Sequence, residues 1–259
     1  MSSARLLENK VAIVTGGDTG IGKGICGCMA REGAAVTIDY HGDRQPADDL
    51  VKQLEQDGGK ALAVSADVTK PEEVENLIEQ TVQTFGRLDI LVNNAGMEIK
   101  HPFLEMPLDV WYKVIDVDLT GPWICAQKAA QQMVKQGAGG RIINISSVHE
   151  DLPMPTNAPY CAAKGGLRML MRTICVELAP HKITVNNIGP GAIDTPMDAP
   201  LKQNPQLMNH LLAEIPLGRM GRPDEIGELA VYLASDAASY VTGSTFFIDG
   251  GMLRQSGSL

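Results

Sequence analysis

The sequence predicts a doubly wound α/β fold, in which one parallel sheet carries helices on both faces. Seven short apolar or β-branched runs recur along the 259 residues and alternate with segments of helical periodicity. The runs are continuously apolar rather than alternating, which indicates strands buried on both sides, as in a parallel sheet. No repeat or linker divides the chain, so we expect a single domain over residues 1–259.

The elements follow one another at regular intervals. The expected strands cover 11–15, 35–39, 61–65, 88–93, 141–146, 183–188 and 244–249. A helix at 72–85 shows an apolar stripe, with Pro71 at its first position and Thr69 as its N-cap. These alternations give the strand and helix order of a doubly wound sheet.

Two later segments carry expectations of their own. A helix over about 160–180 is apolar on more than one side, with Met169 and Val176 away from its core stripe. This pattern predicts a subunit interface, and close cover by a neighbouring helix is the alternative. Gly189 to Leu207, with four prolines, reads as a long irregular stretch, and we expect a substrate lid at about 189–213 rather than a solvated loop.

Composition excludes several classes of protein. The formal net charge of -9 is spread along the chain, which argues against nucleic-acid partners. Five cysteines without paired spacing indicate neither a disulfide framework nor a zinc site, and a reducing cytoplasm fits best. No His-Glu-x-x-His pattern is present, so no metal is expected, and no run approaches the roughly 18 apolar residues of a membrane span.

A glycine-rich turn joins the first expected strand to the first helix. Gly16, Gly20 and Gly22 permit a tight turn and close backbone approach, and the helix N-terminus offers free N–H groups to a pyrophosphate. The order Gly-x-x-x-Gly-x-Gly differs from the common dinucleotide fingerprint, and a plain strand-to-helix connection is the alternative.

The end of the second strand gives a mixed signal about the dinucleotide. Asp18 and Asp39 would repel the 2'-phosphate of NADP, whereas Lys23, His41 and Arg44 would attract it. We therefore expect NAD or NADP, with a slight preference for NAD.

A polar cluster surrounds the start of the 160–180 helix. Tyr160 and Lys164 lie four residues apart and project from the same helix face, while Ser147 ends the fifth strand at the ligand-binding edge of the sheet. A neighbouring ammonium and an oxidised nicotinamide both favour phenolate, so Tyr160 would take a proton from an alcohol as hydride leaves. Ser147 would hydrogen-bond the developing carbonyl oxygen. Ser147 and His149, two residues apart at a strand end, are the closest Ser/His arrangement, and we do not expect a hydrolytic triad.

These residues together resemble the short-chain dehydrogenase/reductase family. The resemblance covers nearly the whole chain and rests on TGGDTGIG at 15–22, NNAG at 93–96, Ser147, the Tyr160/Lys164 pair and Pro190-Gly191. It implies a Rossmann-type seven-stranded sheet, a homotetramer and metal-free hydride transfer to or from NAD(P). It also implies that Asp67 holds the adenine, Asn94 and Gly96 line the adenosine side, Lys164 bonds the nicotinamide ribose, and Ile193 and Thr195 touch the carboxamide end.

The full set of expected cofactor-binding residues is Gly16, Thr19, Gly20, Ile21, Gly22, Tyr40, His41, Asp67, Val68, Asn94, Gly96, Tyr160, Lys164, Pro190, Gly191, Ile193 and Thr195.

One position departs from the family pattern. Asp118 stands where the family usually has the Asn that completes a proton relay with Tyr and Lys. We expect Asp118 to be a catalytic residue that anchors the relay water, while its charge partly offsets the effect of Lys164 on the Tyr160 pKa.

Within the family, the segments at 95–102, 146–150, 185–196 and 238–252 look most like bacterial glucose 1-dehydrogenases. That resemblance implies oxidation of β-D-glucose at C1 to gluconolactone. Carboxylates suit polyols as hydrogen-bond acceptors, and the expected substrate residues are Glu98, Ser147, His149, Tyr160 and Asp194.

The alternatives are a 3-oxoacyl-acyl carrier protein reductase, another short-chain alcohol or ketone dehydrogenase, and a non-catalytic dinucleotide-binding sensor. A 3-oxoacyl-acyl carrier protein reductase shares all of these motifs, but its acidic partner requires a basic mouth, and the expected mouth is acidic. A non-catalytic dinucleotide-binding sensor would not need Ser147, Tyr160 and Lys164, and all three are present.

Overall fold

The computed structural model, which describes residues 5–196 and 199–254, contains one seven-stranded parallel sheet. The strand order is β3-β2-β1-β4-β5-β6-β7, and all six pairings are parallel. The predicted fold class is therefore confirmed. The strands are β1 Val11–Val14, β2 Ala35–Tyr40, β3 Lys60–Ser65, β4 Ile90–Asn93, β5 Gly140–Ile145, β6 Ile183–Pro190 and β7 Thr245–Ile248.

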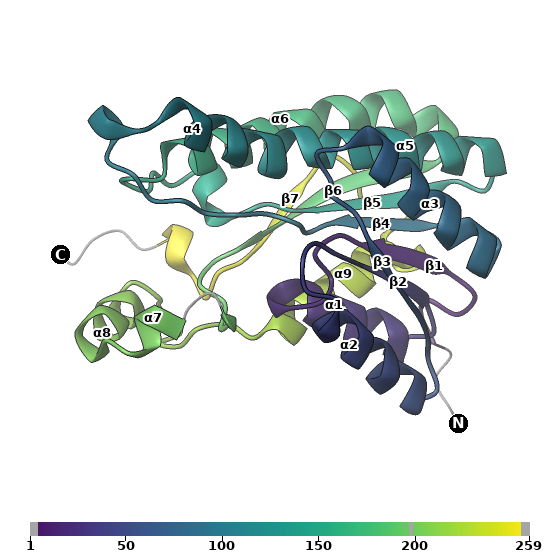
Figure 1. Cartoon of the computed structure of the whole chain (residues 1–259), viewed down its shortest axis with the longest axis horizontal. Helices are drawn as coiled ribbons and strands as arrows, with labels where there is room; N and C mark the ends of the chain where they lie inside the picture. Colours follow the sequence, from purple (N-terminus) through teal and green to yellow (C-terminus); the bar gives the residue numbers. More distant parts are fainter. Residues whose placement is uncertain (1–4, 197–198, 255–259) are drawn as a thin grey trace.

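Two helical layers enclose the sheet (Figure 1). On one face lie α1 Gly20–Arg31, α2 Gln45–Gln56 and α9 Pro223–Ala234. On the other lie α3 Pro71–Phe85, α4 Leu108–Ile115, α5 Gly121–Gln136 and α6 Ala158–Leu178. Each layer buries its own apolar cluster against the strands, which explains why the strand sequences are mostly apolar.

The boundaries of α3 show how a proline sets a helix start. Pro71 occupies the first helical position, as predicted, because its fixed φ suits that place and its missing N–H is not needed there. The N-cap is Lys70, so the prediction of Thr69 was wrong. Thr69 instead donates its hydroxyl to Asp67 Oδ1 at 2.7 Å.

The stretch after β6 is more regular than predicted. It contains α7 Ala199–Lys202 and α8 Pro205–Ala213, with residues 197–198 outside the described part of the chain. Asn204 caps α8, because its side-chain oxygen accepts from the N–H groups of Gln206 and Leu207 while Pro205 takes the first position. The Asn-Pro step was the signal for this helix.

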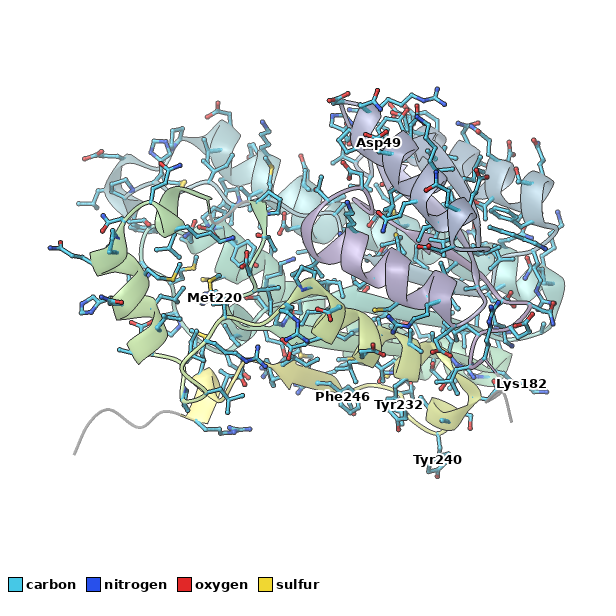
Figure 2. All side chains as sticks on the ribbon, turned by 90° about the horizontal axis from the view of Figure 1, so that it is seen from below. Asp49, Lys182, Met220, Tyr232, Tyr240 and Phe246 are labelled. Carbon is cyan, nitrogen blue, oxygen red and sulfur yellow. The ribbon has the colours of Figure 1, made fainter. Side chains whose placement is uncertain are left out.

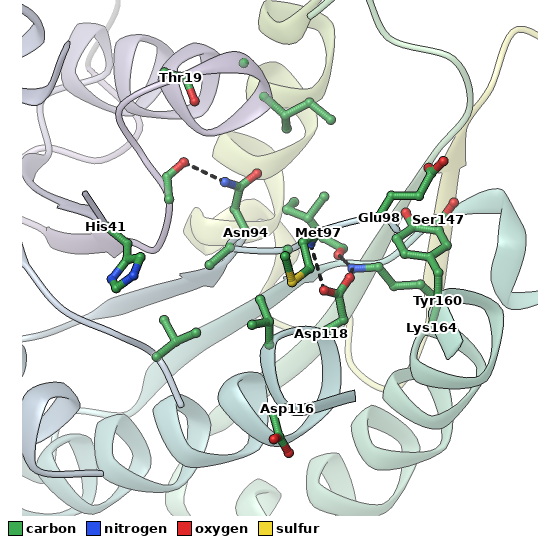
Figure 3. Close-up of a pocket in the computed structure, with 18 of the residues that line it drawn as sticks. Thr19, His41, Asn94, Met97, Glu98, Asp116, Asp118, Ser147, Tyr160 and Lys164 are labelled. Carbon is green, nitrogen blue, oxygen red and sulfur yellow. Dashed lines mark hydrogen bonds and ion pairs between the residues drawn. The ribbon is translucent and has the colours of Figure 1, made fainter. Parts of the chain in front are cut away.

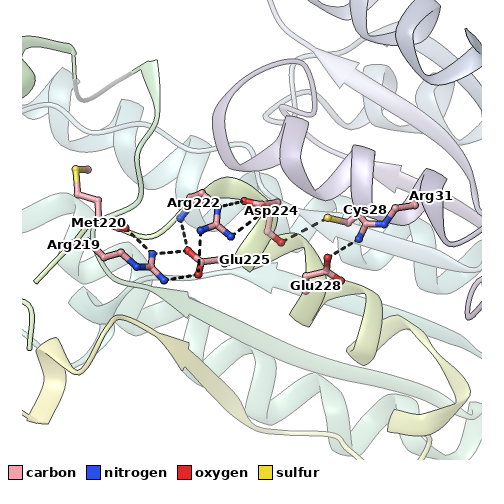
Figure 4. A network of polar contacts seen from close by, with 8 residues as sticks. All are labelled: Cys28, Arg31, Arg219, Met220, Arg222, Asp224, Glu225 and Glu228. Atoms are coloured by element: carbon pink, nitrogen blue, oxygen red, sulfur yellow. Dashed lines mark hydrogen bonds and ion pairs between the residues drawn. The ribbon is translucent and has the colours of Figure 1, made fainter. Parts of the chain in front are cut away.

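A polar network fixes the start of α9 (Figure 4). Glu225 accepts from the N–H of Arg222 at 2.8 Å and from the Arg219 guanidinium at 2.7 and 2.9 Å. The Arg219 hydrogen bonds lower the pKa of Glu225 to about 2. Further along the helix, Glu228 pairs with Arg31 of α1 at 2.6 Å.

Two of the places with exposed apolar side chains lie on α6 and around α9. On α6, Met169 and Val176 are 56% and 71% exposed, so a neighbouring helix does not cover them. Tyr232, Tyr240 and Phe246 gather on another side of the molecule, around α9 and the edge strand β7 (Figure 2). Within the described residues, no helix is both long and apolar enough to cross a membrane.

Candidate active site

A cavity of about 1180 Å³ opens along the carboxyl ends of the strands. Its wall takes residues from the ends of β1, β2, β4, β5 and β6 and from the loop after β3. The strand order reverses between β1 and β4, and ligands of open α/β sheets bind in the crevice at such a point.

The glycine turn forms one end of this cavity. Gly16 and Gly20 have φ of 56° and 51°, which favours glycine, and a Cβ on Gly22 would lie 2.1 Å from the Gly16 carbonyl oxygen. The amide of Asn94 donates to the carbonyls of Thr15 and Gly16 at 2.9 and 2.8 Å and holds the turn in place (Figure 3).

The turn fits a dinucleotide pyrophosphate. Thr19 makes no side-chain hydrogen bond at the start of α1, and no acidic residue lies in the first turn of that helix. The helix N-terminus therefore keeps N–H groups and a partial positive charge for an anion.

The side chains after β2 and β3 lie at the same end of the cavity. His41 is exposed and lines it, whereas Tyr40 is buried and lies outside the lining. Asp67 also lines it. Burial acts to raise the pKa of Asp67, but hydrogen bonds from Thr69 outweigh it and hold that pKa below its usual value.

A buried carboxyl, Asp39, lies beneath the turn, and the sequence analysis used it only for the choice between NAD and NADP. Asp39 is 2% exposed and accepts from the Gly16 N–H at 3.2 Å through Oδ2. Its Oδ1 has no hydrogen-bond partner within the described residues. Burial raises the pKa of Asp39 to about 7, and the charges of Asp18 and Asp67 contribute to the rise.

Ser147, Tyr160 and Lys164 meet at the other end of the cavity (Figure 3). Ser147 follows β5, and its hydroxyl accepts from the His149 N–H at 3.1 Å. Tyr160 and Lys164 come from the first turns of α6, with the Lys164 ammonium 5.3 Å from the centroid of the Tyr160 ring. Lys164 is also anchored by a hydrogen bond of 3.2 Å to the Ile145 carbonyl.

Asp118 reaches this group from a π-helical turn. The turn, Asp116–Thr120, joins α4 to α5, and Asp118 is its buried residue. Its Oδ1 accepts from the Met97 N–H at 2.8 Å, and its Oδ2 lies 3.2 Å from Lys164 Nζ. Asp118 and Lys164 thus form a buried ion pair beside the Tyr160 phenol.

The charges act on Tyr160 in opposite directions. Burial raises the Tyr160 pKa most, Lys164 and a hydrogen bond to Ser147 lower it, and Asp118 and Glu98 raise it. The effect of Lys164 has the expected direction. However, the net pKa lies above the usual value in the chain without a cofactor, so Lys164 alone does not make Tyr160 a base.

Some of the expected substrate residues line the cavity and others lie outside it. Glu98 lines the cavity beside Tyr160 (Figure 3). His149 lies outside the lining, with its ring edge against Tyr160 and its Nδ1 3.2 Å from the Leu152 carbonyl oxygen. Asp194 is exposed, lies outside the lining and pairs with Lys202 of α7.

Most of the expected cofactor residues line the cavity. They are Gly16, Thr19, Gly20, Ile21, His41, Asp67, Val68, Asn94, Gly96, Tyr160, Lys164, Pro190, Gly191 and Thr195. Gly22, Tyr40 and Ile193 lie behind the wall, and all three are buried.

Sequence reasoning also missed Asn157. It is fully buried, and its amide donates to Glu98 Oε1 at 3.2 Å. Its position three residues before Tyr160 was the only local signal, because the contact with Glu98 joins segments 59 residues apart.

No group of three or more His, Cys, Asp or Glu side chains within residues 5–196 and 199–254 is arranged to hold a metal ion.

Known proteins match this chain over almost its whole length. A family model described as Enoyl-(Acyl carrier protein) reductase matches residues 16–253. Glucose 1-dehydrogenase 2 of Bacillus subtilis (strain 168) is 40% identical, with 95% of both chains covered. 3beta-hydroxysteroid dehydrogenase 1 of Eggerthella lenta is 41% identical, with 97% of this chain and 96% of the relative covered.

A solved structure is also similar to this chain over nearly its whole length. The crystal structure of acetoin dehydrogenase from Enterobacter cloacae has a TM-score of 0.87 at 42% identity and covers 96% of this chain and 98% of that chain. The relatives have different substrates in their names but one kind of chemistry. This chain belongs to the short-chain dehydrogenase/reductase family of NAD(P)-dependent oxidoreductases.

Proposed function

We propose that this enzyme oxidises a sugar hydroxyl, with C1 of β-D-glucose as the preferred site and gluconolactone as the product. The observation that carries the proposal is the position of Glu98, a carboxylate in the cavity wall beside Ser147 and Tyr160. The 40% identity to a glucose 1-dehydrogenase supports it.

The proposed roles follow from the placement of the side chains. When bound, the dinucleotide supplies the nicotinamide that accepts the hydride. Tyr160 Oη takes the proton of the substrate hydroxyl, and Ser147 hydrogen-bonds the developing carbonyl oxygen. The Lys164 ammonium lowers the Tyr160 pKa against the effect of burial, and Asp118 holds Lys164 in place.

The cavity wall disfavours an acidic carrier protein as a partner. Among the described residues of the lining, acidic side chains outnumber the two lysines, Lys113 and Lys164. The acidic residues of the lining are Asp18, Asp39, Asp67, Glu98, Asp109, Asp116 and Asp118. An acyl carrier protein requires the opposite charge near the mouth.

For the cofactor, we propose a preference for NAD over NADP. Of the three cationic groups considered for a 2'-phosphate, only His41 lines the cavity. Arg44 pairs with Asp48 at 3.0 Å, and the carboxyl groups of Asp18 and Asp39 lie in the wall nearby. We further propose that the segment at 189–213 acts as a lid and that the Asp194–Lys202 pair ties α7 to the end of β6.

An absorbance assay at about 340 nm tests this proposal, because reduced nicotinamide absorbs there and the oxidised form does not. The substrate panel is D-glucose, other aldoses, acetoin and a 3-hydroxysteroid, each with NAD and NADP, and a 3-oxoacyl thioester with NADH and NADPH. We expect the highest kcat/KM for an aldose with NAD. Rapid reduction of the thioester with no signal from any aldose would contradict the proposed substrate.

A further inference from the structure

The turn before α6 contains a backbone conformation that its sequence does not favour. Thr156 has a φ of 71°, in the left-handed region. Of the three non-glycine residues described there, Thr156 is the β-branched one, for which this region is a clear outlier. Strained residues of this kind persist where the surroundings require them, and they gather at functional sites.

The strained turn ties two segments of the active site together. The Thr156 carbonyl accepts from the His101 N–H at 2.8 Å. The next residue, Asn157, precedes α6 in the N-cap position and is fully buried. The conformation of Thr156 therefore brings Asn157 against the segment that carries Glu98.

Asn157 does not perform the usual role of an N-cap asparagine. Its side chain makes no capping hydrogen bond, although asparagine in this position normally accepts from the first N–H groups of the helix. Its amide instead donates to Glu98 Oε1, and its Oδ1 is left without a hydrogen-bond partner among the described residues. Leaving a buried acceptor unsatisfied is unfavourable, so helix capping does not explain this arrangement.

Glu98 is held on one side only. Asn157 Nδ2 and Lys100 Nζ both lie 3.2 Å from Oε1. Within residues 5–196 and 199–254, no hydrogen bond of Glu98 uses Oε2. The side chain is 24% exposed and lines the cavity, and its charge acts on Tyr160, so it lies close to the reacting hydroxyl.

We infer that Asn157 is a positioning residue, which fixes Glu98 so that Oε2 accepts a hydrogen bond from the substrate hydroxyl on the carbon next to the one oxidised. The pair then selects vicinal diols and sugars over simple alcohols. The inference depends on the proposed function only in that a hydroxylated substrate enters this cavity. A purely structural tie between the two segments is the competing explanation.

Asn157→Asp separates the two explanations. An aspartate is nearly isosteric and is a good N-cap, so α6 keeps its start, but its carboxylate repels Glu98 instead of donating to it. The matched substrates are D-glucose and 2-deoxy-D-glucose, which share the C1 hydroxyl and differ in the neighbouring one. We expect kcat/KM to fall by about tenfold or more on glucose, mainly through KM, and by much less on 2-deoxyglucose.

The double variant Glu98→Gln with Asn157→Asp provides a rescue. It exchanges the amide and the carboxylate, so the net charge beside Lys100 is retained and the pair regains a hydrogen bond with reversed polarity. The glutamine oxygen is then free to face the substrate. We expect the preference for glucose over 2-deoxyglucose to recover above that of either single variant. Thr156→Gly, which relieves the strain and retains Asn157, is the control, and we expect its preference to match that of the unchanged enzyme.

Equal losses on both sugars, no loss on either, or a double variant no better than the single ones would overturn the inference. So would loss of NADH binding in Asn157→Asp, since this would show a structural tie. If the unchanged enzyme oxidises no aldose, the proposed function fails by itself. The pair 2,3-butanediol and 2-butanol then makes the same comparison for Asn157, with the same expected results.

Discussion

At the scale of single residues, charge and burial control the chemistry of this site. Tyr160 has a raised pKa in the chain without a cofactor, because burial outweighs the help from Lys164. The negative charge of Asp118 also raises the Tyr160 pKa, and the neutral amide that the family usually has at this position would not do so. The Tyr160 pKa therefore depends on opposing effects of burial and of a few neighbouring side chains, and substitution of each side chain tests its effect.

Asp118→Asn changes this balance in one direction. Removing the carboxylate removes an effect that raises the Tyr160 pKa, so the rising limb of kcat/KM against pH for alcohol oxidation should move to lower pH, with most activity retained. The amide can still accept from the Met97 N–H. Asp116→Asn, which changes an exposed neighbour in the same turn, should leave the profile in place. Complete loss of activity in Asp118→Asn would show that the site depends on the acid itself.

The raised pKa of Asp39 predicts that the stability of the protein depends on pH. Its pKa is raised from 3.8 to about 7, so its contribution is fully present below pH 3.8 and is lost as the pH rises through 7. Asp39→Asn removes this loss. The variant should therefore be more stable than the unchanged protein by about 2–4 kcal/mol at pH 8 and should show little advantage at pH 4. Urea unfolding at both pH values measures this, and an equal effect at both would contradict the shifted pKa.

At the scale of elements, the sequence was most informative where local rules decide. All seven predicted strands are present, because a parallel sheet buries both faces and demands continuous apolar runs. Pro71 marked the start of α3 correctly, whereas the stretch expected to be irregular, from Gly189 to Leu207, contains α7 and the start of α8 at Asn204-Pro205. The glycine turn and the Tyr160/Lys164 pair were also found, since their meaning lies in local spacing.

Local sequence patterns do not predict contacts between segments that are far apart in the chain. Asn157 meets Glu98, and Asp39 lies beneath the Gly16 turn, only after the sheet has assembled. His149 and Asp194 were placed in the substrate site by their neighbourhood in the sequence, and both lie outside the cavity lining in the structure. Proximity along the chain does not determine the direction of a side chain in a loop.

The start of α9 allows a test of an element boundary. Glu225 closes the capping network, and its pKa of about 2 means that its contribution is present above pH 4.5 and is lost as the pH falls through 2. Glu225→Gln should destabilise the protein by about 1 kcal/mol at pH 7, because the group is partly solvated. Thermal unfolding at pH 7 measures this, with the exposed Glu228→Gln as a comparison that lies outside the cap.

At the scale of the whole molecule, the exposed apolar side chains indicate surfaces that another subunit would bury. Met169 and Val176 on α6, and Tyr232 and Tyr240 around α9, are exposed in the single chain. Exposed apolar groups on opposite sides of a protein are typical of faces buried by association. We predict a homotetramer, with a mass in sedimentation equilibrium about four times the 27.7 kDa of the chain. Val176→Lys should shift the mass toward smaller species, and a monomeric unchanged protein would contradict the prediction.

Tyr160 is the group that we expect to take the proton from the substrate, and Tyr160→Phe tests this role most directly. The phenylalanine ring retains the packing and loses the hydroxyl. We predict that turnover falls by about 10³-fold or more while the Kd for NADH, measured by fluorescence titration, changes little. Turnover equal to that of the unchanged enzyme, with the substrate it prefers, would contradict the catalytic role given to this site.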